Sequence, residues 1–339
     1  MTERADAATV EKASRPAPRP LGTGYRAPWS DRIAEAVIRG LALVSVLSIA
    51  LIFVFIAKEA IPLFFEPEAQ QEFGGLAALF SPRTWPGYDA SVFIWQPVGG
   101  TPKMNLVPLF VGTLKITVLG MLFSVPLAVL AAIFVSQYAT RRAREVLKPA
   151  LELMASIPSV VLGFFALMVL ASLMQDTLGL PSRLNALVAA VGLAIAIAPV
   201  VFTVSEDALS SVPRELAAAA LALGARKHQV VLRIVLPAAL PGIAAGAILG
   251  FGRAIGETMI VLMASGNAAV VELFDPTSSA RTVTATIASE LGEVTPGDAH
   301  WRVLFLLGSL LFVVTFVLNR LAVWVVEALQ RRWTAGASR

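Results

Sequence analysis

The chain has 339 residues, of which 57% are apolar and only 15% are charged, and its mean hydropathy is +0.75. A soluble domain of this length needs far more polar surface, so the composition predicts an all-α integral membrane protein. The sequence has no cysteine and two histidines, which excludes disulfides, thiolate metal sites and a His-rich metal site. Its net charge of +4 is too small and too scattered for a nucleic-acid-binding patch, so no nucleic acid is expected as a partner.

The first 32 residues are basic and rich in proline, and they lack the apolar core of a signal peptide. We expect residues 1–32 to form a disordered cytoplasmic tail, with a docking segment for a partner as the alternative.

Six stretches are long and apolar enough to cross a bilayer, which takes roughly 20 residues. They lie at about 35–57, 106–136, 147–174, 185–204, 239–263 and 301–328. The corresponding domains are a first transmembrane helix at 33–58, an extracytoplasmic loop at 59–105, a transmembrane domain at 106–330 and a cytoplasmic tail at 331–339.

Lysine and arginine gather in alternate connections of this six-span arrangement, at 1–32, 137–148, 205–237 and 331–339. Because basic residues mark the cytoplasmic side, both termini are predicted to be cytoplasmic. The 59–105 loop then faces outward, and its tryptophans and tyrosine favour anchoring at the membrane surface, with a short helix at 72–80.

Residues 210–243 form the most informative cytoplasmic stretch. Alanine and leucine predict a helix over 214–223, with Ser211 as its N-cap. Gly224 is expected to end this helix.

A second, basic and amphipathic helix is expected over 225–235, closed by Pro237. We expect its surface to present Val230, Val231 and Ile234. The alternative is an ordinary amphipathic surface helix that contacts no partner.

The stretch GFGRAIGETMI at 250–260 places two opposite charges in an apolar span. Each costs about 2.5–3.5 kcal/mol at the bilayer centre, so such residues usually face a protein interior or a pathway. At about 100° per residue, Arg253 and Glu257 fall on the helix face of the small residues. These are Gly242, Gly246, Gly250 and Ala254.

Three interpretations of this pair stay open. Arg253 and Glu257 could bind each other, or Arg253 could bind a passing phosphate oxyanion while Glu257 positions it. The pair could also form a gate latch that reaches a partner subunit. Lys115, a further charge within a span, could be a second anion contact or could extend toward the membrane surface.

No hydrolytic machinery is visible, because the chain has no GxxxxGK[ST] phosphate-binding loop, no Ser–His–Asp arrangement and no paired carboxylates. We therefore expect no catalytic residue, cofactor or metal, and the chain is predicted not to be an enzyme. ATP hydrolysis would have to come from a separate subunit.

The spacing from Gly224 to Ile234, Leu236 and Pro237 resembles the coupling-loop signature of ABC importer membrane subunits. That signature begins with Glu-Ala-Ala, and here residues 218–220 are three alanines, with Glu215 one helical turn earlier. The resemblance implies that residues 211–237 form this coupling loop, which we call the coupling segment, and that it docks on an ATPase subunit. The residues it assigns to coupling are Glu215, Ala219, Gly224, Ala225 and Pro237.

Five further stretches are together similar to the permease subunits of phosphate importers, most of all to the PstC type. They are GTLKITVLGM at 112–121, IPSVVLGFFAL at 157–167, GRAIGETMIVLMASGN at 252–267, RTVTATIASELGE at 281–293 and HWRVLFLLGSLLFVVTFVLNRLA at 300–322. The resemblance implies a six-helix type I (MetI-like) permease in the cytoplasmic, or inner, membrane, with Arg253, Glu257 and Lys115 in the substrate pathway.

Such a permease translocates inorganic phosphate by alternating access. Its implied partners are a PstA-like second permease subunit, two ATP-binding subunits, an extracytoplasmic phosphate-binding protein and membrane lipid. Import of another oxyanion (sulfate, molybdate or phosphonate) and a scaffolding or signalling role without transport stay open as alternatives.

Overall fold

The computed structural model describes residues 29–66, 75–85, 89–100 and 102–337. Most of the predicted N-terminal tail therefore lies outside the described residues. The chain divides into two compact units, the first ending at Phe53 and the second beginning at Val54.

The first unit contains most of helix α1 (Trp29–Ala60). This helix begins four residues before the predicted first span and ends two residues after it. Near its start, Glu35 and Arg39 form an ion pair at 2.5 Å across one helical turn. From residue 40 to residue 57 the helix has no charged side chain and apolar residues on every face, which suits a helix that crosses a bilayer.

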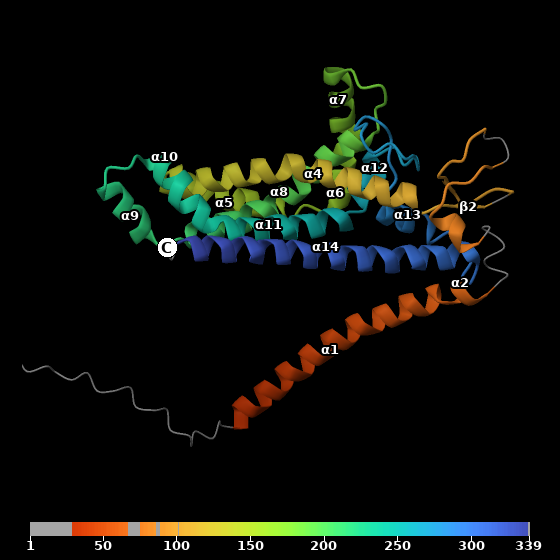
Figure 1. Cartoon of the computed structure of the whole chain (residues 1–339), viewed down its shortest axis with the longest axis horizontal. Helices are drawn as coiled ribbons and strands as arrows, with labels where there is room; N and C mark the ends of the chain where they lie inside the picture. Colours follow the sequence, from red (N-terminus) through yellow and green to blue (C-terminus); the bar gives the residue numbers. More distant parts are fainter. Residues whose placement is uncertain (1–28, 67–74, 86–88, 101, 338–339) are drawn as a thin grey trace, which may run out of the picture. The chain divides into compact units, whose positions relative to one another are not determined.

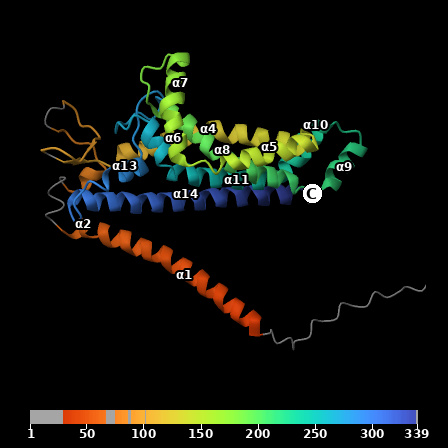
Figure 2. The ribbon, with the colours of Figure 1, turned by 180° about the vertical axis from the view of Figure 1, so that it is seen from behind.

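Three long helices form the centre of the second unit: α4 (Val107–Ile133), α8 (Ala186–Ser210) and α11 (Leu236–Gly256). Helix α14 (Ala299–Ala337) lies along α11, as both views of the ribbon show (Figure 1, Figure 2). Helix α8 is the most central of the spans, because 61% of its most apolar 18-residue stretch is buried.

Six helices in the described part of the chain are long and apolar enough to cross a membrane, which agrees with the predicted count. They are Trp29–Phe65, Val107–Tyr138, Ser159–Leu178, Ala186–Ser210, Lys227–Gly256 and Ala299–Ala328.

The third span is shorter than the predicted 147–174. Helix α5 (Arg141–Met154) is a separate amphipathic helix, and the chain leaves helical geometry before α6 (Ser159–Phe165). The cause is Pro158, which disfavours a helical conformation at the residue before it. The span continues through a π turn, η3 (Ala166–Leu170), into α7 (Ala171–Leu178).

The fifth span also differs from its predicted limits of 239–263. Helix α9 (Arg214–Ala222) is followed by α10 (Lys227–Val230), which continues through the π turn η4 (Val231–Val235) into α11. Pro237 therefore does not close a helix. It lies in the first turn of α11, directly after the π turn η4, inside a helix that runs from Lys227 to Gly256.

A second group of short elements covers one end of the bundle. They are α2 (Pro62–Phe65), the 3₁₀ turn η1 (Leu76–Leu79), the antiparallel strands β1 (Trp95–Gln96) and β2 (Lys103–Met104), and α13 (Val283–Glu290). The helix expected at 72–80 is thus only this 3₁₀ turn, and residues 72–74 lie outside the described part. The loop packs on the start of α14 through buried Leu63, Leu79, Trp95 and Leu106.

Helices α9 and α10 lie at the other end of the bundle, beside the C-terminal end of α14 (Figure 1). The basic connections 137–148 and 205–237 share that end, since α4 continues through a π turn, η2 (Phe134–Tyr138), toward α5 there. Within the second unit, connections rich in lysine and arginine therefore lie at one end of the bundle and connections poor in them at the other, as predicted.

Candidate functional site

The small-residue face of α11 is a close helix contact with α8. A Cβ built at Gly242 would lie 2.4 Å from Ala208 Cβ, and one at Gly250 would lie 2.6 Å from Val201 Cγ2. No side chain fits at these two positions, so glycine sets the distance between the two helices. The prediction that these small residues face protein is confirmed.

The predicted helix does not continue through Glu257. Helix α11 ends at Gly256, Glu257 is extended with ψ 130°, and α12 (Met259–Ala264) begins two residues later. Glu257 Oε1 accepts hydrogen bonds from the backbone N–H groups of Thr258 at 3.0 Å and Met259 at 3.1 Å. The carboxylate therefore caps α12 and makes the break possible, because it satisfies amides that a continuous helix would otherwise bond.

Arg253 lies in the last turn of α11, next to this break, and is half-buried. It forms no ion pair with Glu257, so the interpretation that the two charges bind each other is wrong. Among the residues that the structure describes, no side chain or carbonyl pairs with its guanidinium. The cation lies at the end of α11 where the helix dipole favours positive charge.

The break is also tied to α13. The Thr284 hydroxyl donates to the Glu257 carbonyl at 2.9 Å, so α11, α12 and α13 meet at one point. In transporters, non-helical backbone at membrane depth is tolerated where it lines a cavity or is buried in protein.

Lys115 of α4 does not extend to the membrane surface, as one interpretation expected. Its side chain is only 4% exposed, and Nζ donates to the Glu272 carbonyl at 2.8 Å and to Ser278 Oγ at 2.6 Å. The amine therefore fastens the segment between α12 and α13 to α4. Lys115 forms no hydrogen bond or ion pair with Arg253 or Glu257, so the structure does not bring the three predicted pathway residues into one cluster.

The predicted coupling residues gather at the opposite end of α11 from Arg253. Glu215 and Ala219 are exposed on α9, whereas Ala225 and Pro237 are half-buried. Gly224 ends this segment of helix with φ +84°, the left-handed conformation expected there. Sixteen residues of helix separate Pro237 from Arg253, about 24 Å at 1.5 Å per residue.

The exposed face of the coupling segment differs from the predicted one. Val230 and Val231 are 4% and 2% exposed, because they pack inward on the bundle. Leu216, Leu221 and Leu223 are exposed instead, at 49%, 50% and 90%. Ser211 does not cap α9 but donates to the Ala208 carbonyl at the end of α8.

A buried carboxylate near this end was not predicted as a hub. Glu206 of α8 is 0% exposed and accepts from Lys148 Nζ at 2.6 Å, from Ser210 Oγ at 2.7 Å and from the Arg144 guanidinium. We call these four residues the Glu206 clasp. Lys148 also pairs with the exposed Asp207 at 2.9 Å. Its hydrogen bond to Glu206, and to a smaller extent its hydrogen bond to Asp207, raise the pKa of Lys148.

A similar cluster lies at the opposite end of the bundle from the coupling segment. Glu290 of α13 accepts from Trp95 Nε1 at 3.0 Å, pairs with His300 Nε2 at 2.8 Å and is bonded by the Arg281 guanidinium. Sequence reasoning interpreted Trp95 as a membrane-surface anchor, but it is 4% exposed in this contact. The cluster joins the β hairpin to both α13 and the start of α14.

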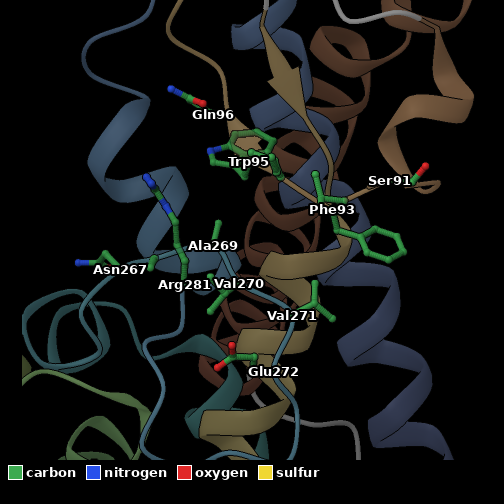
Figure 3. Close-up of a pocket in the computed structure, with 13 residues that line it drawn as sticks. Ser91, Phe93, Trp95, Gln96, Asn267, Ala269, Val270, Val271, Glu272 and Arg281 are labelled. Atoms are coloured by element: carbon green, nitrogen blue, oxygen red, sulfur yellow. The ribbon is translucent and has the colours of Figure 1, made fainter. Parts of the chain in front are cut away.

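Two cavities at this end share Trp95, Gln96 and Arg281 in their walls, with volumes of about 650 and 700 Å³. The first lies between the hairpin and residues 267–272. Figure 3 shows Arg281 and Trp95 together on one side of it, with Glu272 farther along the wall. The sequence alone could not predict the clusters around Glu206 and Glu290, because the residues that form each cluster lie far apart in sequence.

Comparison with known proteins places this arrangement in a family. Residues 124–335 match the family described as "Binding-protein-dependent transport system inner membrane component". The chain is 33% identical to the probable ABC transporter permease protein YqgH of Bacillus subtilis (strain 168), over 66% of this chain and 72% of that protein. It is 34% identical to the phosphate transport system permease protein PstC of Mesorhizobium japonicum, over 70% of this chain and 77% of that protein.

Solved structures share the fold. A bacterial alginate ABC transporter chain matches with a TM-score of 0.54 and 17% identity, covering 90% of this chain and 98% of its own. The six apolar helices, the helical bundle and the family match over 124–335 agree with one another. This chain belongs to the family of binding-protein-dependent transport system inner membrane components, the permease subunits of ABC importers.

Proposed function

We propose that this chain is the PstC-type subunit of an importer for inorganic phosphate. The PstC relatives are 30–34% identical to it over about 70% of the chain, which supports phosphate as the substrate class. The partners we infer are a PstA-like permease subunit, two ATPase subunits and an extracytoplasmic phosphate-binding protein. Both termini would lie in the cytoplasm of a cell with this importer in its inner membrane.

The observation that carries the proposal is the free guanidinium of Arg253 beside the helix break. A guanidinium binds phosphate oxygens through two parallel N–H donors and keeps its charge in any environment. Glu257, four residues away, provides nearby negative charge while its carboxylate caps α12. The site would therefore bind an anion without holding it as tightly as an isolated cation would.

The arrangement of α11 supports alternating access as the mechanism. Its first turns continue directly from the coupling segment, and its last turn carries Arg253. Closure of the ATPase subunits would move α9 and α10, and the helix would transmit that movement to the break. Arg253 would then face the outer and the cytoplasmic sides in turn.

The test is phosphate uptake by proteoliposomes that contain the whole complex. Arg253→Ala removes a charge-assisted contact, so uptake at low phosphate is expected to fall about 10- to 100-fold. Arg253→Lys keeps the charge but loses the paired donors, and an intermediate loss is expected. Wild-type uptake by an assembled Arg253→Ala complex would refute the pathway role.

Competition separates the oxyanions. Unlabelled sulfate, molybdate or phosphonate is expected to compete poorly with labelled phosphate. Equal competition by one of them would contradict the assignment to phosphate, and absence of any uptake by the wild-type complex would favour a scaffolding role.

A further inference from the structure

Helix α5 is held to the bundle by polar contacts more than by an apolar face. None of its residues is buried, and Leu151 is its partly buried contact with the apolar cluster of α4, α8 and α11. No helix continues from either end of α5: Thr140 is extended before it, and the chain leaves helical geometry between Met154 and Ser159. The position of α5 therefore depends on the Glu206 clasp.

The clasp matches two helical pairs. Arg144 and Lys148 are four residues apart on α5, and Glu206 and Ser210 are four residues apart on α8, so each pair shares one face of its helix. Both oxygens of Glu206 are engaged, one by Lys148 and the other by Arg144 and Ser210. A fully buried carboxylate is costly unless paired in this way, so the contact fixes the two helices in one register.

The coupling segment reaches α5 from the other side. Lys227 Nζ of α10 lies 5.1 Å from the centre of the Tyr138 ring, a cation–π contact. Tyr138 ends the π turn η2, two residues before Thr140 caps α5. Helix α8 ends at Ser210, and the chain passes through the turn at 211–213 into α9. Helix α8, the coupling segment and α5 therefore form a ring that the Glu206 clasp closes.

A cavity separates α9 from α5 inside this ring. Its volume is about 230 Å³, and its walls include Arg144 of α5, Ser210 of α8 and Ala217 of α9. Movement of α9 therefore cannot pass to α5 through close packing at this point. The contacts that remain between the two sides are Ser210, which belongs to the clasp, and the Lys227–Tyr138 pair.

We propose that Glu206 is a positioning residue that makes α5 and α8 move as one body when the coupling segment moves. The clasp thereby ties ATP hydrolysis by the ATPase subunits to reorientation of the permease. This inference rests on the proposed function.

The experiment compares two carboxamide variants in the whole complex, with the binding protein present. Phosphate imported and ATP hydrolysed are measured in the same proteoliposomes. Glu206→Gln keeps the size of the side chain but weakens its hold on both cations, and the phosphate imported per ATP is expected to fall about fivefold or more while hydrolysis continues. Asp207→Asn is the matched control, since it removes an adjacent charge from Lys148 outside the buried contact, and its ratio is expected to stay within about twofold of wild type.

An unchanged ratio in Glu206→Gln would overturn the inference, and so would a parallel loss of uptake and hydrolysis, which indicates a structural role alone. If Glu206→Gln fails to assemble, Arg144→Gln and Lys148→Met each weaken the clasp from its exposed side, and an unchanged ratio in both would overturn it. Absence of phosphate uptake by the wild-type complex would instead refute the proposed function, and the inference with it.

Discussion

Glu257 has a structural role that can be separated from its charge. Its carboxylate accepts two short backbone hydrogen bonds at the start of α12, and glutamine keeps an oxygen that can accept them. We expect Glu257→Ala to lower stability by about 1 kcal/mol and Glu257→Gln by much less. Both variants are expected to reduce phosphate uptake, because both leave Arg253 without a nearby negative charge.

Thermal unfolding of the purified complex and uptake at low phosphate are the two measurements. Equal stability losses in the two variants would show that the carboxylate does not act as a cap, whatever their uptake.

Lys148 leads to a pH prediction with a definite sign. The Glu206 and Asp207 acceptors raise its pKa, so its contribution to stability is complete below the unfolded lysine value, about 10.4, and is lost as the pH rises through the folded value. Lys148→Met should therefore lower the melting temperature by the same amount from about pH 6 to about pH 9.

Melting curves of wild type and Lys148→Met at several pH values check this expectation. A difference that already disappears near neutral pH would mean that the amine is not held by its carboxylates.

Residue identity alone predicted part of the candidate site. Arg253 and Glu257 stood out because charges in an apolar span are costly, and that argument needs no partner. The helical wheel that placed both charges on one face assumed a continuous helix, and Glu257 ends that helix. Glu206 and Glu290 could not be recognised as hubs, since their partners Arg144 and Trp95 lie on distant elements.

At the scale of elements, the coupling segment turns at one residue. Gly224 has φ +84°, and a Cβ there would meet no atom within 4 Å, so a substitution is opposed by backbone strain alone. We expect Gly224→Ala to destabilise the bend between α9 and α10 by about 1–2 kcal/mol. Retention of the ATPase subunit on the purified permease is expected to fall accordingly.

Gly292→Ala is the control for this variant. It also lies in open space but has no positive φ, so retention should match wild type. Full retention in Gly224→Ala would mean that the bend is not needed for docking.

The elements that the sequence predicted well are those set by local rules. Alanine-rich composition and Gly224 gave α9 nearly to the residue, and apolar length gave the six spans. The limits of α5 were missed although Pro158 was visible, because an apolar run on both sides of a proline resembles one kinked span. Its amphipathic character matters only once the partner face on α8 is known.

For the molecule as a whole, the absence of cysteine gives a direct test of orientation. Leu223 is 90% exposed on the coupling segment, and Val98 is 78% exposed in the hairpin at the other end. In spheroplasts, a membrane-impermeant maleimide is expected to label Val98→Cys but not Leu223→Cys. Permeabilised cells should label both, and the cysteine-free parent neither.

Labelling of Leu223→Cys in intact spheroplasts would reverse the proposed orientation. The basic connections would still alternate with the others between the two ends of the bundle, as the fold supports. The rule that assigns the basic side to the cytoplasm would then fail for this chain.

Three exposed leucines of the coupling segment affect how long the chain persists in a cell before it assembles. Leu216, Leu221 and Leu223 leave an apolar surface exposed to water unless a partner covers it. A chain synthesised in excess of its ATPase subunits would present that surface to proteases and chaperones, so its lifetime should be set by the supply of partners. Leu223→Lys is then expected to lengthen the lifetime of the unassembled chain, which a pulse–chase measurement without the ATPase subunit would detect.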